Sequence, residues 1–219
     1  MYTKLTLKLA RELHVAQYLE PIYSELHAGL LPSEVIKLSR IKNIDQHYAF
    51  MVTKHFMPRE DQCLFAIWMV NQIANYLDNE IYVKSIEQSE LYIYGSISRE
   101  ELKNTFYIAD EFYYQDVDKT SSGLIKKAKC IVHYLGNLVY LDIPFFLGSI
   151  YSKFEALKVA EVSPGVWKSG PNGEPINDEE LDIKNKYFEA CRREEKFLID
   201  KILDYFLVVE SGQKYNWKI

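Results

Sequence analysis

The segment from residue 58 to residue 77 constrains the fold most, because its apolar residues lie on every side of a helix. Pro58 suits the first turn of a helix, and Glu60 and Asp61 would place negative charge at its N-terminal end. The apolar positions that follow are Leu64, Phe65, Ile67, Trp68, Met69, Val70, Ile73, Ala74 and Leu77. A helix that is apolar all round has to be covered on every side. We therefore expect this segment to be the central helix of a multi-helix domain.

The rest of the chain also has the periodicity of helices. A first helical segment extends from Leu5 to Gly29, and Pro21 either kinks it or restarts it. Ser98 and Glu101 have the spacing of a capping box, which predicts the start of another helix. No stretch shows the sustained two-residue alternation of a strand.

Glycine and proline mark the later boundaries. We expect Gly136 and Asn137 to interrupt the helix that follows residue 123. Residues 162–178 are rich in Gly and Pro and predict a loop, and the remainder predicts one long helix over residues 178–209. The sequence thus predicts an all-α, bundle-like single domain, residues 1–219, with about seven to nine helices.

Composition and charge exclude several classes of protein. The net charge of −5 and the absence of a basic stripe argue against a nucleic-acid-binding protein. The chain lacks an apolar run of the roughly 20 residues that span a bilayer. We expect no membrane insertion and a cytoplasmic location. The three cysteines, Cys63, Cys130 and Cys191, form no CxxC pair, so we expect buried thiols rather than disulfides or a zinc ribbon.

Familiar catalytic and cofactor motifs are absent from the sequence. There is no G-x-S-x-G element around a nucleophilic serine, and neither phosphate-binding glycine pattern occurs. The triplet Glu-Leu-His is repeated at His14 and His27, but a spacing of 13 residues places the two rings on nearly opposite faces of a helix. We expect no protein-held metal and no cofactor.

Arg40 and His47 are separated by six residues and resemble the R-x(4–6)-H pair of the HEPN ribonucleases. In that family an arginine and a histidine converge on the scissile phosphate. A guanidinium can hold the phosphate while an imidazole transfers a proton. The resemblance implies a metal-independent ribonuclease with both residues on one face of a helix, although a helix break near Asn43 would separate them.

Residues 66–114 resemble the helical putative immunity proteins of bacterial toxin systems. The resemblance consists of an aromatic-rich helix, Asp78, a helix with Ser85-Ile86-Glu87, and Gly95 followed by the cap at Ser98 and Glu101. The chain departs from that family because Tyr, Phe and Ile replace the expected alanines. The resemblance implies a bacterial or phage protein that neutralises a toxin.

Our leading hypothesis is therefore a non-enzymatic helical protein that binds another protein, either a toxin or a host protein. Interface anchors are enriched in Tyr and Trp. On that basis the candidate binding residues are Tyr113, Tyr114, Trp167 and Trp217. The ribonuclease is the alternative, and a carrier of an apolar ligand is a third class that the aromatic content permits. The sequence does not indicate an oligomeric state.

Overall fold

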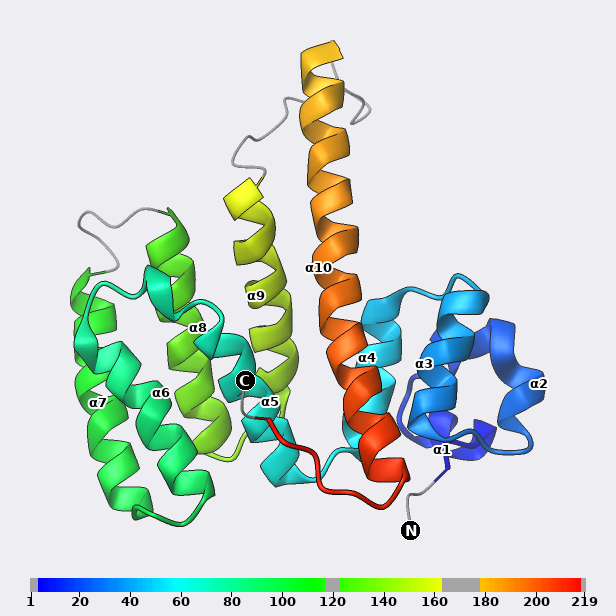
Figure 1. The fold of residues 1–219 in the computed structure, drawn as a ribbon, viewed down its shortest axis with the longest axis horizontal. Helices are drawn as coiled ribbons and strands as arrows, with labels where there is room; N and C mark the ends of the chain where they lie inside the picture. Colours follow the sequence, from blue (N-terminus) through cyan, green and yellow to red (C-terminus); the bar gives the residue numbers. More distant parts are fainter. Residues whose placement is uncertain (1–3, 117–122, 163–177, 218–219) are drawn as a thin grey trace. The chain divides into compact units, whose positions relative to one another are not determined.

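The computed structural model describes residues 4–116, 123–162 and 178–217 (Figure 1). These residues form ten α-helices, three short 3-10 helices and, in place of a sheet, one isolated bridge between Leu5 and Leu30. The predicted all-α class is confirmed. The α-helices are α1 (Leu7–Glu12), α2 (Tyr23–Leu26), α3 (Pro32–Ile41), α4 (Gln46–Thr53), α5 (Arg59–Asn71), α6 (Glu80–Ile93), α7 (Arg99–Asp116), α8 (Gly123–Val139), α9 (Phe145–Val162) and α10 (Asp178–Glu210). The 3-10 helices are η1 (Ala16–Ile22), η2 (Lys54–Phe56) and η3 (Ala74–Tyr76).

The chain divides into two compact units. Unit 1 comprises residues 1–58 and 193–216, and unit 2 comprises residues 59–192 and 217–219. The helix α10 therefore contributes its first part to unit 2 and its second part to unit 1. The single-domain organisation expected from the sequence stays a prediction.

Unit 1 begins with a segment that the sequence predicted as one interrupted helix. His14 adopts a φ of 56°, which ends α1, and Pro21 lies inside η1, directly before α2. This division raises the number of helices above the seven to nine expected. A buried aliphatic cluster holds the unit together, formed by Leu5, Leu7, Ala10, Val15, Leu19, Ile22, Leu26, Val35, Ile44 and Val52.

Within unit 1, a carboxylate near the end of α10 caps the start of α3. Pro32 is the first residue of α3, and the backbone N–H of Ser33 donates to Glu210 Oε1 at 3.0 Å. The Ser33 hydroxyl donates to the other oxygen of Glu210. The first N–H groups of a helix have no partner inside the helix, so Glu210 satisfies one of them and also complements the helix dipole.

Unit 2 is built around α5, as the apolar pattern predicts. All eight residues of the stretch 63–70 are buried, and α5 packs against α6, α8 and α9. The helix ends at Asn71 and the chain continues through η3, so the continuous helix is shorter than the predicted 58–77. The long C-terminal helix expected over 178–209 is present as α10. The predicted loop at 162–178 lies almost wholly outside the described residues.

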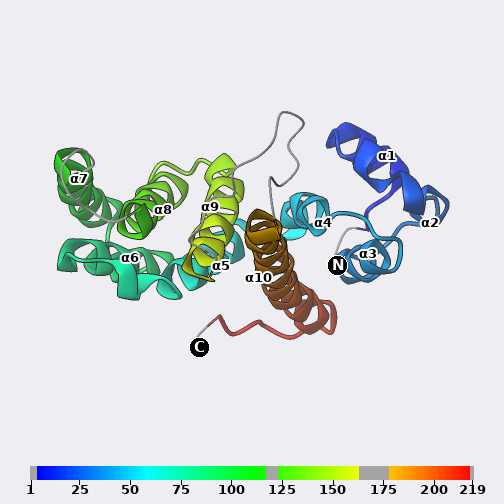
Figure 2. The same ribbon diagram turned by 90° about the horizontal axis from the view of Figure 1, so that it is seen from above.

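In the remainder of unit 2, α6, α7 and α8 lie side by side (Figures 1 and 2). The capping box before α7 is confirmed, since Ser98 N donates to Glu101 Oε2 at 2.8 Å and Glu101 N donates to Ser98 Oγ at 3.2 Å. The expected interruption at Gly136 is wrong, because α8 continues through it to Val139. A Cβ at Gly136 would lie 2.5 Å from Phe106 Cδ1. Glycine therefore permits the close approach of α7 and α8.

Candidate functional site

The outer side of α7 carries four large apolar side chains that are exposed to solvent. Tyr107 and Tyr114 are 64% and 67% exposed, and Ile108 and Phe112 are also exposed. We call these four residues the α7 surface. The face of the helix that packs into unit 2 supplies buried Leu102, Thr105, Phe106 and Ala109. The sequence pattern of α7 thus contains a core face and an exposed face on which these four apolar side chains stand among polar ones.

The position of α7 in unit 2 explains why this face stays open. The helix packs mainly against α6 and α8, and Figure 2 shows both partners on one side of it. Polar residues Asn104, Glu111 and Gln115 are interspersed on the exposed face. An apolar patch with polar neighbours is typical of a protein-interaction surface.

Tyr113 and Tyr114, both predicted as binding residues, have different environments. Tyr113 is half-buried, and its ring stacks on His133 with a centroid separation of 5.3 Å and an interplanar angle of 6°. Burial, followed by a hydrogen bond with the Cys130 thiol, raises the pKa of Tyr113. Tyr114 packs edge-on against Tyr113 and remains accessible. The ring of Tyr114 is therefore accessible for contact with another molecule, whereas the half-buried ring of Tyr113 packs against the ring of Tyr114.

Near this surface, His133 contacts the carboxylate of Asp110, a pairing that also occurs in catalytic sites. Its Nδ1 lies 2.7 Å from Asp110 Oδ1, and its Nε2 lies 3.2 Å from the Asn137 amide nitrogen. Because the amide nitrogen donates, Nε2 accepts and Nδ1–H donates to Asp110. Both ring nitrogens are thus engaged inside the protein, and His133 is not positioned as a general base for a substrate.

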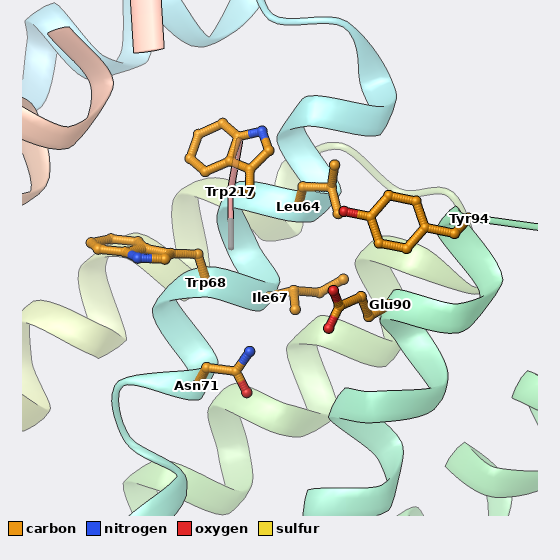
Figure 3. Close-up of a pocket in the computed structure, with 7 residues that line it drawn as sticks. All are labelled: Leu64, Ile67, Trp68, Asn71, Glu90, Tyr94 and Trp217. Carbon is orange, nitrogen blue, oxygen red and sulfur yellow. The ribbon is translucent and has the colours of Figure 1, made fainter. Parts of the chain in front are cut away.

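Trp217, predicted as a binding residue, is buried. Its side chain is 6% exposed, its ring lies 5.5 Å from that of Phe65, and its Nε1–H donates to Asp61 at 2.9 Å. Trp217 lines a pocket between α5 and α6 (Figure 3). The other predicted anchor, Trp167, lies outside the described residues.

Of the two arrangements that the sequence leaves open for Arg40 and His47, the structure has the one with a helix break near Asn43. Arg40 lies in α3 and His47 in α4, because Asn43 takes a φ of 52° between the two helices and Asp45 caps α4 by accepting from His47 N. The Arg40 guanidinium forms an ion pair with Asp200 at 2.5 Å in the same unit. Its charge is therefore already compensated by a carboxylate.

A second pocket, of about 460 Å³, lies in unit 2 where Arg59 and Arg99 begin α5 and α7. Arg59 Nε donates to Asp142 at 2.5 Å, and Arg99 Nη2 donates to the carbonyl of Tyr140 at 3.0 Å. Both guanidinium groups therefore hold the turn between α8 and α9. Arg59 Nη1 is buried without a hydrogen-bond partner among the described residues, but the paired Asp142 cancels much of the attraction for an anion.

The cysteines are free thiols with different accessibility. Cys63 is buried, and burial raises its pKa to about 11, so the thiol stays protonated at neutral pH. Cys130 and Cys191 are half-buried. The expectation of buried thiols is confirmed for Cys63 and wrong for the other two.

No family model, curated protein or solved structure matches the chain. The resemblances to the immunity proteins and to the HEPN ribonucleases thus stay predictions. Among the described residues, no group of three or more His, Cys, Asp or Glu side chains could hold a metal ion. In the same part of the chain, no helix is both long and apolar enough to cross a bilayer.

Sequence reasoning identified Tyr114 but missed Tyr107, Ile108 and Phe112. Their signal is present in the sequence, because these apolar residues fall outside the stripe formed by Leu102, Phe106, Ala109 and Tyr113. A helical projection separates the two sets. The pockets could not be found in this way, since they depend on contacts between distant segments.

Proposed function

We propose that the protein is a non-enzymatic factor that binds another protein through the α7 surface. The observation that carries the proposal is the exposure of Tyr107 and Tyr114 beside Ile108 and Phe112 on one helix. Large aromatic side chains contribute strongly to binding when a partner covers them, and they lose little conformational entropy. A folded chain gains little from holding four such groups in water.

The charge and the resemblance narrow the class of partner. The net charge of −5 favours a partner with a basic surface, because complementary charge accelerates association. The resemblance of residues 66–114 to immunity proteins includes the first sixteen residues of α7. A bacterial toxin is therefore the partner class that we favour over a host protein.

The ribonuclease alternative has less support. It needs a guanidinium free to hold a phosphate and an imidazole on the same helix face. Arg40 is paired with Asp200, and His47 belongs to the next helix. The acidic net charge also opposes the approach of RNA.

Affinity purification from the native host tests the proposal. The tagged chain should recover a stoichiometric partner, and Tyr107→Ala combined with Tyr114→Ala should lose it. Phe145→Ala is the matched control, because Phe145 is 74% exposed but lies on α9. Circular dichroism should give the same helical content for all variants. A partner that is retained by the double variant, or the absence of any stoichiometric partner, would contradict the proposal.

Incubation with total RNA tests the alternative separately. We expect no cleavage above a buffer control. Cleavage that disappears in His47→Ala would overturn the non-enzymatic assignment, while cleavage retained in that variant would indicate a contaminating nuclease.

A further inference from the structure

A pocket of about 330 Å³ lies in unit 2 beside α5 and α6 (Figure 3), and none of the four α7 surface residues is among its described lining residues. Its lining consists of Leu64, Ile67, Trp68, Asn71, Glu90, Tyr94 and Trp217. The lining is apolar and aromatic on the side of α5 and Trp217. The polar groups come from α6 and from the end of α5.

The aromatic walls are fixed in place. Trp68 is 5% exposed, and its ring stacks on Phe65 with an interplanar angle of 12°. Trp217 packs on the same Phe65, and its hydrogen bond to Asp61 sets the orientation of the indole. Preformed walls of this kind lose little freedom when a ligand binds.

The polar groups give the pocket a negative character. Glu90 is half-buried, and its carboxylate forms no hydrogen bond or ion pair with any residue that the structure describes. Figure 3 shows the Glu90 carboxylate and the Tyr94 hydroxyl projecting from α6 towards α5. Burial, then Glu90, Glu60 and Asp61, raise the pKa of Tyr94. Among the residues that the structure describes, no lysine or arginine lines the pocket.

We propose that this pocket binds the guanidinium group of an arginine side chain, held over the indoles of Trp68 and Trp217 and paired with the Glu90 carboxylate. In the cell the arginine belongs to the protein partner, and this part of the inference rests on the proposed function. Tryptophan has the strongest attraction for cations among the aromatic residues. A carboxylate can accept two parallel N–H bonds from a guanidinium.

The arrangement favours guanidinium over other cations. A guanidinium is planar, so it can stack on an indole while its edge donates to oxygen atoms. Glu90, Asn71 and Tyr94 place such oxygen atoms in the lining. A quaternary ammonium has no N–H groups and could donate no hydrogen bond to the Glu90 carboxylate. An ammonium is strongly hydrated and cannot stack.

Titration of the full-length, isotope-labelled chain with N-acetyl-arginine methylamide tests the pocket, with the indole N–H signals followed by NMR. We expect the signals of Trp68 and Trp217 to shift, with millimolar affinity. Glu90→Gln should weaken binding about tenfold, which is the effect of losing a charged hydrogen-bond partner. Glu87→Gln is the matched control, because Glu87 lies on the same helix, is exposed and does not line the pocket. The neutral analogue N-acetyl-citrulline methylamide should bind at least about tenfold more weakly than the arginine compound.

Two results would overturn the inference. One is equal affinity of Glu90→Gln and Glu87→Gln for the arginine compound, and the other is equal affinity of the citrulline and arginine compounds. The titration contains no partner protein, so its failure leaves the α7 proposal standing. Conversely, if the titration shows arginine binding but the affinity purification recovers no partner, the proposed function and the assignment of the arginine to a partner are overturned, while guanidinium binding by the pocket stands.

Discussion

The indole Nε1 of Trp217 donates a hydrogen bond to the Asp61 carboxylate at 2.9 Å, although 156 positions of the sequence separate the two residues. Asp61 lies in the first turn of α5, so the bond attaches the last described residue to the central helix of unit 2. Trp217 is buried, and the bond satisfies the one polar group of its ring.

Substitutions at Asp61 should distinguish the hydrogen bond from simple packing. Asp61→Ala leaves the buried indole N–H without this acceptor and should lower the free energy of unfolding by about 2 kcal/mol. Asp61→Asn keeps an amide oxygen at the same position and should lower it by less than about 1 kcal/mol. Urea denaturation of both variants measures the difference. Equal losses would show that the bond to Trp217 contributes nothing.

Gly136 permits the contact between α7 and α8, which gives a second prediction. Alanine normally stabilises a helix by about 1 kcal/mol relative to glycine. At Gly136 the added methyl would meet the buried Phe106 ring, so Gly136→Ala should instead destabilise the protein by about 1–3 kcal/mol. The loss of stability is measured by thermal melting, with circular dichroism as the signal.

The matched control places the same change where space is available. Gly123→Ala is on the same helix, and an added Cβ there meets no atom within 4 Å. It should be neutral or slightly stabilising. Phe106→Leu should recover part of the loss in the Gly136→Ala background, since it shortens the side chain that clashes. An equal melting temperature for Gly123→Ala and Gly136→Ala would contradict the steric explanation.

The sequence predicts what depends on local patterns and misses what depends on distant contacts. The all-round apolar pattern of residues 58–77 predicts the buried centre of unit 2, and the Ser98–Glu101 spacing predicts the start of α7, because both signals are local. The burial of Trp217 depends on Asp61 and Phe65, far away in the sequence. The prediction that Gly136 interrupts a helix is wrong for the same reason, because this glycine makes room for the ring of Phe106, which is distant in the sequence.

Asp78 and Lys129 form an ion pair with unequal burial, which gives a third prediction. The Nζ–Oδ1 distance is 3.0 Å, and the side chains are 2% exposed for Lys129 and 44% for Asp78. Asp78→Ala removes a carboxylate from a buried ammonium and should cost about 3 kcal/mol of stability. Lys129→Met leaves a carboxylate that water can reach and should cost about 1 kcal/mol or less.

Urea denaturation of the two single variants and the double variant checks this asymmetry. The double variant should be close to Lys129→Met alone, because Asp78 has no buried charge left to compensate. A greater loss in Lys129→Met than in Asp78→Ala would contradict the prediction. Asp78 belongs to the segment that resembles immunity proteins, and its ion pair with Lys129 gives it a structural role within the chain.

Two histidines in unit 1 predict how stability depends on pH. Burial lowers the pKa of His47 and His55 below the ordinary value of about 6.5. The Asp45 carboxylate opposes this shift at His47, and the charge of Lys54 lowers the pKa of both rings. An unfolded chain therefore binds protons at these rings more readily than the folded chain does. Their stabilising contribution is complete above about pH 6.5 and is lost as the pH falls through that value towards the lower folded pKa.

We expect the melting temperature to fall between about pH 7 and pH 5, and His47→Gln to make that fall shallower, because the neutral amide takes up no proton. His27→Gln, at an exposed position, is the control for removing any histidine. The Asp200 carboxylate, whose pKa is lowered by Arg40 and Lys196 against the opposing effect of burial, titrates at more acidic pH and leaves this window unaffected. If the melting temperatures of His47→Gln and His27→Gln fall equally between about pH 7 and pH 5, His47 is not the cause of the pH dependence.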